Sequence, residues 1–139
     1  MIGALYFENP EGEIVVSKNM FYDSAGIVVS GGGQAQPISI VNNKFVSKPQ
    51  HVQDDTFWIR VNAGYHIIKH NSFLDGSMAV GMLLGYGDQI YNFDVSDNYW
   101  NTVDPNQIAD RVMDYNDDLK LGGPFIFEPF LTEPHPDTP

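Results

Sequence analysis

The side chains best suited to ligand binding gather beside an insertion in the middle of the chain. Residues 47–56 lengthen one interval of an otherwise regular pattern, and the alternation of the strand that follows directs Trp58, Arg60 and Asn62 outward beside this loop. An exposed indole stacks on a pyranose ring and a guanidinium pairs with a carboxylate, so this combination indicates recognition of a sugar or a uronate. The residues predicted to bind the ligand are Trp58, Arg60, Asn62, His51, Asp54 and Asp55.

A purely structural interpretation of the same residues stays open. Trp58 could pack beneath the loop, and Arg60 could form a salt bridge with Asp54 or Asp55. Aromatic residues that anchor loops and ion pairs on surfaces are both common. The two interpretations differ in whether the indole is exposed to solvent.

A second polar group surrounds His70, which directly precedes a recurring asparagine. A lyase or an epimerase needs a base and a charge-neutralising cation beside an acidic carbon, and His70 with Lys69 and Asp75 offers that combination. The candidate catalytic residues are therefore His70, Lys69 and Arg60. The same residues fit an ordinary solvated face of mixed charge, so catalysis is one alternative of two. His66 occupies an inward position and is predicted to be a hydrogen-bonded core histidine.

No metal or cofactor site is predicted. Asp114, Asn116 and Asp118 resemble the opening of a calcium loop, but Leu119 stands where the turn glycine belongs and Phe125 where the bidentate glutamate belongs. The sequence therefore predicts that the chain binds no metal and no cofactor.

Composition narrows the class of protein and of partner. The chain has 139 residues, no cysteine, 42% hydrophobic residues and a formal net charge of −11. This length and composition predict one folded domain, and the absence of cysteine excludes disulfides and thiolate catalysis. The acidic balance argues against nucleic acid and anionic membranes as partners, and no apolar run of about 18 residues is present. The first eight residues lack the basic and apolar regions of a signal peptide, which leaves the compartment open.

The architecture is indicated by an internal repeat of two alternating apolar positions, an asparagine, any residue and an aromatic residue. The four copies are Ile14, Val16, Asn19, Phe21; Ile38, Ile40, Asn43, Phe45; His66, Ile68, Asn71, Phe73; and Phe93, Val95, Asn98, Trp100. A short alternating strand precedes each copy, with inward pairs Leu5 and Phe7, Ile27 and Val29, Ile59 and Val61, and Met82 and Leu84. The asparagines are 24, 28 and 27 residues apart. Several short strands in each repeat of this length are typical of a β-solenoid in which each repeat forms one coil.

Two columns of side chains follow from stacking such coils. Equivalent residues would lie about 4.8 Å apart, so the four asparagines are predicted to form a column that satisfies backbone groups at a corner. The aromatic residues are predicted to stack beside this column. An antiparallel sandwich with ordinary asparagine turns is the competing fold, but it does not explain four matching copies.

The pattern changes after the fourth copy. Asp104, Pro105 and Gln107 supply an N-cap, a proline at the first helical position and a capping-box partner, which predicts a helix from Asp104 to about Tyr115. A final strand is expected at Phe125 and Phe127. The predicted organisation is coils over residues 1–103, a helix and edge-strand cap over 104–131, and an extended, poorly ordered, proline-rich tail over 132–139.

These features carry a family resemblance. The segment from Asp97 to Pro105, the helix from Gln107 to Tyr115, the turn at residues 116–118 and the closing residues 129–131 resemble the C-terminal coil and cap of bacterial right-handed parallel β-helix proteins of the pectate-lyase-like superfamily. The resemblance implies an all-β solenoid, a right-handed single-stranded parallel β-helix of about four coils with a C-terminal capping helix. It also implies carbohydrate as the favoured ligand class and favours a secreted or cell-surface location, with the cytoplasm otherwise.

Three classes of function remain open. The first is non-catalytic polysaccharide recognition through Trp58, Arg60 and the insertion. The second is a lyase-like or epimerase-like enzyme. The third is a structural assembly unit, because an uncapped N-terminal coil with inward Leu5 and Phe7 invites edge pairing, and a homodimer through this end is expected.

Overall fold

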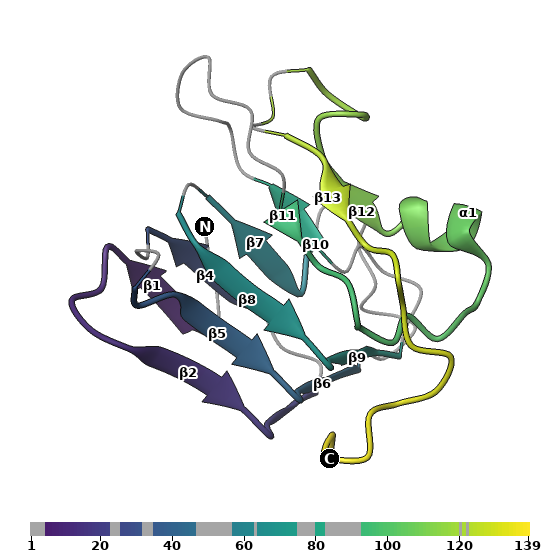
Figure 1. Cartoon of the computed structure of the whole chain (residues 1–139), viewed down its shortest axis with the longest axis horizontal. Helices are drawn as coiled ribbons and strands as arrows, with labels where there is room; N and C mark the ends of the chain where they lie inside the picture. Colours follow the sequence, from purple (N-terminus) through teal and green to yellow (C-terminus); the bar gives the residue numbers. More distant parts are fainter. Residues whose placement is uncertain are drawn as a thin grey trace.

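The computed structural model of the chain describes residues 5–22, 26–31, 35–46, 57–62, 64–74, 80–82, 93–119, 121 and 123–139. These residues form an all-β protein built from parallel sheets, as Figure 1 shows. One short helix, α1 (Pro105–Ala109), occurs among them. In the part of the chain described, no helix is long and apolar enough to cross a membrane.

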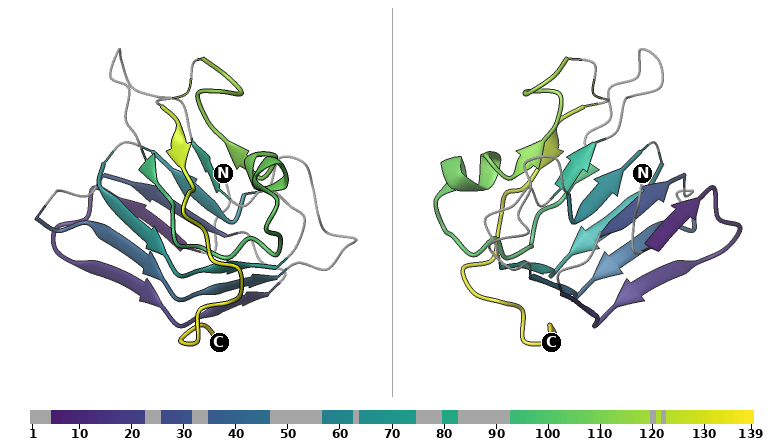
Figure 2. Two further views of the ribbon diagram at one scale, coloured as in Figure 1. Left: turned by 45° about the vertical axis from the view of Figure 1, so that its right-hand side comes forward. Right: turned by 180° about the vertical axis from the view of Figure 1, so that it is seen from behind.

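Four parallel sheets contain the described strands. The first sheet has the order β1 (Leu5–Glu8), β4 (Ile27–Ser30), β7 (Ile59–Val61), β10 (Val80–Met82) and β12 (Val112–Met113). The second contains β2 (Ile14–Ser17), β5 (Ile38–Val41) and β8 (His66–Lys69), and the third contains β3 (Met20–Tyr22), β6 (Lys44–Val46) and β9 (Ser72–Phe73). A two-stranded sheet pairs β11 (Phe93–Asp94) with β13 (Phe125–Ile126). Figure 2 shows that the first and second sheets face each other across a shared interior.

The pairing registers confirm the alignment of the sequence repeats. Ile14 pairs with Ile38, and Ile38 pairs with His66, as the repeats predict. The fourth strand of the first sheet differs, because Ile59 pairs with Val80, two residues earlier than the predicted partner Met82.

The interior contains β-branched and aromatic side chains from all three main sheets. The largest fully buried ones are Trp100, Phe45, Phe73, Ile27, Ile38, Ile40, Ile59, Ile68 and Ile108. The aromatic column is confirmed: the ring centroids of Phe21, Phe45, Phe73 and Trp100 are successively 4.9, 5.1 and 5.0 Å apart. The offset stacking of these rings adds to the free energy gained from their burial.

The asparagine column is also confirmed. The backbone amides of Asn19, Asn43 and Asn71 each donate to the side-chain oxygen of the next asparagine, at 3.0, 3.0 and 2.8 Å, and the column ends at Asn98. The residue before each asparagine has a φ of 57° or 58°, and these four residues, Lys18, Asn42, His70 and Asp97, are called the corner row. Each corner-row residue turns the chain between two sheets, and the asparagine beside it satisfies the backbone groups of the turn.

The helix is shorter than the sequence predicts. Asp104 caps it and accepts from Asn106 N, and Pro105 occupies the first turn, as expected. The helix ends at Ala109, and β12 extends the first sheet by pairing with β10. Gln107 accepts from the Thr102 hydroxyl rather than closing a capping box. Ile108 and Val112 are both buried at a helical spacing, but Ile108 lies in the helix and Val112 in the strand that follows it. The helix ends here because the edge of β10 offers hydrogen bonds to a strand.

The C-terminal segment covers the last repeat and then turns back. Asp97 N donates to Pro129 O at 2.7 Å, and Leu131 N donates to Asn98 O at 2.9 Å. The sequence predicts an extended and poorly ordered tail. The structure instead shows the tail turning at His135, where Thr138 N donates to His135 O, and running past the carboxyl ends of the second-sheet strands (Figures 1 and 2).

Candidate functional site

The predicted exposed platform at Trp58 is wrong. Trp58 is only 3% exposed and belongs to the core, with its ring centroid 5.5 Å from that of Phe45. Trp58 directly precedes β7, and Ile27 N donates to its carbonyl oxygen at 2.7 Å. At this point the chain enters the sheet, and the large indole gains more from filling the corner beside the aromatic column than from solvent exposure.

The remaining residues predicted near the insertion have different outcomes. Arg60 and Asn62 are partly exposed, and the Arg60 guanidinium carbon lies 5.0 Å from the Phe57 ring centroid. His51, Asp54 and Asp55 lie outside the described residues. The predicted salt bridge from Arg60 to either aspartate therefore stays a prediction.

A groove lies on the outer face of the first sheet, beside Asn62. The register pairs Glu8 with Ser30, and the pairing of Val29 with Val61 brings Ser30 beside Asn62, so a polar row crosses three strands. The right-hand view of Figure 2 shows β1, β4 and β7 from this side. The groove has a volume of about 460 Å³ and is lined by Tyr6, Glu8, Asn9, Ser30, Gly31, Asn62 and Gly64.

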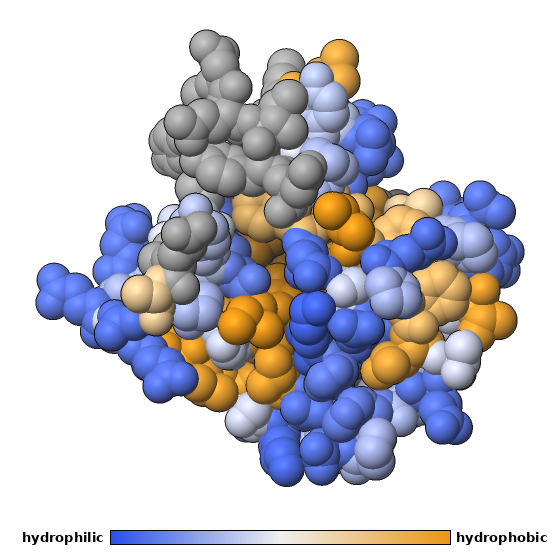
Figure 3. Space-filling view, in the orientation of Figure 1, coloured by the Kyte–Doolittle hydropathy of each residue, from blue (hydrophilic) through white to orange (hydrophobic). Residues whose placement is uncertain are grey.

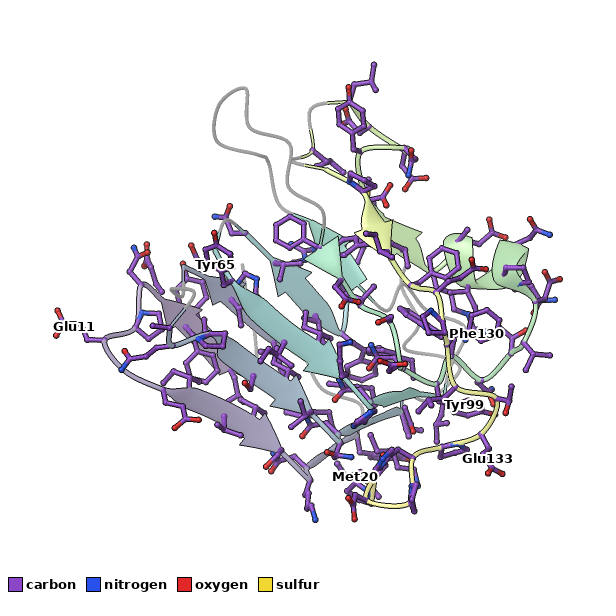
Figure 4. The ribbon with its side chains drawn as sticks, in the orientation of Figure 1. Glu11, Met20, Tyr65, Tyr99, Phe130 and Glu133 are labelled. Atoms are coloured by element: carbon purple, nitrogen blue, oxygen red, sulfur yellow. The ribbon has the colours of Figure 1, made fainter. Side chains whose placement is uncertain are left out.

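The backbone of two turns shapes this groove. Gly31 and Gly64 have φ values of 87° and 124°, which favour glycine. A Cβ atom on Gly64 would lie 1.8 Å from Gly31 O, and one on Gly31 would lie 2.6 Å from Asn9 Oδ1. Glycine is therefore required where successive turns stack closely, and backbone groups line the groove there. Tyr65, half-exposed beside Gly64, is labelled in Figure 4 at the start of β8.

Tyr6 supplies the exposed aromatic ring of the groove. It is 58% exposed, and its register partner on β4 is the buried Val28, which in turn pairs with Arg60. An aromatic face, a carboxylate, two amides and a hydroxyl thus converge on one concave surface. Such a surface can stack on a flat ligand ring and hydrogen-bond to several hydroxyl groups at once.

His66 lies close to the groove but inside the protein. Burial lowers the pKa of His66 to about 4, and the nearby Gly31 backbone offsets this shift only in part. Both ring nitrogens are buried, and neither makes a hydrogen bond of good geometry with a described residue. The imidazole of His66 is therefore neutral at pH 7.

Lys69 and His70, from the second predicted group, each contact other side chains at the end of β8. Lys69 Nζ lies 3.2 Å from Asp94 Oδ2 and 3.1 Å from Asp97 Oδ2, and the hydrogen bond to Asp97 is the main cause that raises the pKa of Lys69. A lysine whose pKa is raised stays charged and cannot act as a base. The His70 ring is covered by His135 at a centroid distance of 4.2 Å. Asp75 lies outside the described residues, and Arg60 lies in the first sheet, apart from the turn that holds His70.

The partial calcium motif holds a turn. Asp114 is buried and accepts from Asn116 N at 2.8 Å and from Phe125 N at 2.7 Å, while Asp114 N donates to Asp117 Oδ2. Within the described ranges, no group of three or more histidine, aspartate or glutamate side chains is placed to hold a metal ion.

Tyr6, Glu8, Asn9 and Ser30 were missed as candidate ligand-binding residues by reasoning from the sequence. The signal was present in the strand alignment, because Leu5 and Phe7 face inward and their neighbours must face outward. Aligning the repeats also places Glu8, Ser30 and Asn62 in one row. The candidate aromatic residue for ligand stacking is therefore the exposed tyrosine of the first repeat and not the buried tryptophan of the third.

Comparisons of the chain with protein-family models, curated proteins and solved structures found no match.

Proposed function

We propose that the chain is a right-handed parallel β-helix of about four coils whose outer surface recognises a neutral polysaccharide. The chain visits the sheets in a fixed order, with β1, β2 and β3 followed by β4, β5 and β6 and then by β7, β8 and β9. Each strand pairs in parallel with its equivalent in the next repeat. This order supports a solenoid, and the general right-handedness of parallel crossovers and the resemblance to pectate-lyase-like proteins support the hand.

The observation that carries the ligand proposal is the groove beside Tyr6. A sugar ring presents an apolar face that can stack on the tyrosine, and its hydroxyl groups match Glu8, Ser30 and Asn62. The polar row crosses strands that are about 4.8 Å apart, so it can follow an extended chain ligand rather than a single small molecule.

Charge favours a neutral sugar over a uronate. The groove contains Glu8, and the chain carries a net charge of −11. An anionic polymer would approach this surface against repulsion. Arg60 on β7 contacts the Phe57 ring. Its single positive charge does not reverse the negative electrostatic field of the chain.

The test is binding of the purified protein to an array of neutral and acidic glycans. We expect binding to neutral polymers, with Tyr6→Ala weakening it about tenfold, the equivalent of roughly 1.4 kcal/mol. Tyr22→Ala is the matched control, because Tyr22 is 55% exposed but lies on β3, away from the groove. Absence of binding to every glycan, or equal weakening by both variants, would contradict the proposal.

A lyase-like or epimerase-like activity is the weaker alternative. It would require Lys69 and His70 to act on a substrate, whereas Lys69 is paired with Asp94 and Asp97 and His70 lies under His135.

A second proposal concerns self-association through the edges of the first repeat. β1, β2 and β3 are edge strands of their sheets, and inward residues on them, such as Leu5, Phe7 and Ile14, are only partly buried. Their register partners Ile27, Val29 and Ile38 are fully buried. Figure 3 shows hydrophobic surface over the region where Figure 1 draws β2 and β5. We propose that this end pairs with a second copy of the chain.

Sedimentation velocity over a range of concentrations tests this pairing. Val15 on β2 and Ile67 on β8 share one outward row and are 52% and 40% exposed, but only Val15 lies on the edge strand. We expect Val15→Lys to abolish dimers and Ile67→Lys to preserve them. A wild-type protein that stays monomeric up to its solubility limit would refute the pairing.

A further inference from the structure

The outer edge of β1 carries backbone groups of the same residues that line the groove. Leu5 N and Asn9 N donate to carbonyl oxygens of the neighbouring segment around β4, at 3.3 and 2.9 Å. In a parallel strand, alternate residues direct their backbone groups to opposite sides. Tyr6 and Glu8 therefore direct their N–H and C=O groups away from β4, at the edge where the first sheet ends among the described residues. The right-hand view of Figure 2 shows β1 at this end of the sheet.

A second copy of the chain can pair with this edge and keep both interiors covered. A two-fold axis normal to the first sheet sets the two β1 strands antiparallel and leaves both inner faces on the same side. A two-fold axis along the strands would set them parallel, but it would turn the inner face of one copy, with Leu5 and Phe7, toward solvent. The antiparallel arrangement therefore extends the first sheet from one copy into the other.

The hydrogen-bonding pattern limits the register of this pairing. The backbone groups at the edge belong to Tyr6 and Glu8, so the axis must lie at Tyr6, Phe7 or Glu8. An axis at Glu8 would set two carboxylates opposite each other, and an axis at Tyr6 would leave Glu8 without a partner among the described residues. An axis at Phe7 pairs each Tyr6 with the partner's Glu8, and each pair exchanges both hydrogen bonds.

The same register covers an inner side chain that the first repeat leaves partly exposed. Phe7 is only partly buried, whereas its register partner Val29 on β4 is fully buried. At the axis, the two Phe7 residues form a non-hydrogen-bonded pair with their Cα atoms about 4.5 Å apart. Their rings can therefore pack against each other and close the core at the end of the repeat stack.

We propose that two copies join through β1 about a two-fold axis at Phe7, and that their grooves form one site to which both copies contribute. This inference rests on the glycan recognition proposed above. Across the seam, the outward row of Glu8, Ser30 and Asn62 continues directly to the partner's Tyr6. The hydrogen-bonding groups of one copy thus lie in line with the aromatic ring of the other. The ligand class is a neutral polysaccharide long enough to cross both grooves.

Disulfide crosslinking tests the seam, because the chain has no cysteine of its own. Phe7→Cys places the two thiols at the axis, where the Cα separation suits a disulfide. We expect oxidised glutathione to convert this variant to a covalent dimer, in about 0.15 M salt to screen the repulsion between acidic copies. Leu5→Cys is the matched control, because it also faces inward on β1 but lies about 13 Å along the strand from its counterpart. Equal crosslinking of both variants, or none of a folded Phe7→Cys, would overturn the seam.

A pair of exposed positions decides the seam if Phe7→Cys does not fold. Tyr6→Cys and Glu8→Cys face each other across the seam, with Cα atoms about 5.5 Å apart. We expect disulfides in a mixture of the two variants and none in either variant alone. Crosslinking of Tyr6→Cys alone, or of no mixture, would contradict the axis at Phe7.

Calorimetry with neutral oligosaccharides of increasing length tests the shared site. Val15→Lys should prevent pairing while leaving the groove unchanged, and Ile67→Lys is its matched control. We expect the affinity of the wild type and of Ile67→Lys to rise at least about tenfold beyond the ligand length at which Val15→Lys levels off. The same length dependence in all three proteins would overturn the shared site and leave glycan recognition intact. No binding of any oligosaccharide would contradict glycan recognition itself, and the shared site with it.

Discussion

Asn71 connects three consecutive repeats through one side chain. Its oxygen accepts from the backbone and side-chain amides of Asn43, at 3.0 and 3.1 Å. Its Nδ2 donates to Ile40 O in the preceding repeat at 2.8 Å and to Asn98 Oδ1 in the following one at 3.0 Å. Because Asn71 is fully buried, water cannot replace these hydrogen bonds.

Replacing Asn71 should therefore cost more than replacing the first asparagine. Asn71→Ala leaves buried donors and acceptors unpaired, at about 1–3 kcal/mol each, so we expect a loss of about 3–5 kcal/mol in the free energy of unfolding. Asn19→Ala is the control, because Asn19 is exposed and water reaches its groups, and it should cost about 1 kcal/mol or less. Urea denaturation measures both. Similar losses for the two variants would show that the column does not stabilise the fold in this way.

His66 makes stability depend on pH. Its folded pKa of about 4 lies below the ordinary value of 6.5, so the unfolded chain binds a proton more readily and stability falls as the pH drops below about 6.5. The equivalent residues of the first two repeats are Ile14 and Ile38.

His66→Ile should remove this pH dependence. We expect the variant to exceed the wild type in free energy of unfolding by about 2 kcal/mol more at about pH 5 than at about pH 7.5. The reason is that the variant has no buried imidazole to protonate. Urea denaturation at the two pH values gives the comparison. An equal gain at both would mean that His66 titrates normally in the folded protein.

At the scale of the elements, the turns between sheets depend on glycine for different reasons. Gly12 and Gly64 both have positive φ, at 113° and 124°. A Cβ atom on Gly12 would meet nothing within 4 Å, whereas one on Gly64 would meet Gly31 O. Alanine at Gly12 therefore tests backbone strain alone, whereas alanine at Gly64 tests strain together with the close approach of the two turns.

We expect Gly12→Ala to cost about 1–2 kcal/mol from strain alone. Gly64→Ala should cost at least about 2 kcal/mol more, because the turns must move apart, and it should also disturb the adjacent groove. Thermal unfolding of the two variants measures the difference. Equal melting temperatures would argue against the close stacking of these turns.

The elements show what the sequence could predict. Both columns and the registers of the first three repeats were predictable because each repeat must bury the same positions, whereas the register of β10 was predicted two residues out. The point where the helix ends was not predictable. Val112 stands at helical spacing, which fits a longer helix as well as an added strand, and pairing with β10 makes it a strand.

The candidate site shows the limit more clearly. Alternation assigns Trp58 to the outer face, but it lies one residue before β7, where the pleat does not yet determine direction. The tail contacts of His135 were also unpredictable, since they depend on how the chain turns after covering the last repeat. Long-range docking of a short polar segment leaves no periodic signal in a sequence.

At the scale of the whole molecule, three features meet at the first repeat. The groove lies on the outer face of the first sheet, the tail follows the corner row beyond the second sheet, and the open edges belong to the first repeat. Figure 4 shows Glu11 at the turn between β1 and β2, pointing away from the protein. The proposed glycan surface and the proposed pairing surface therefore share β1, and the tail reaches the first repeat at Lys18.

The most direct test of the proposed function is a nuclear magnetic resonance titration of the labelled full chain with a neutral oligosaccharide taken from the glycan array. We expect saturable shifts that centre on Tyr6, Ser30 and Asn62, with little change at the corner row. Shifts centred elsewhere, or none at ligand concentrations that saturate the array, would contradict recognition at this groove.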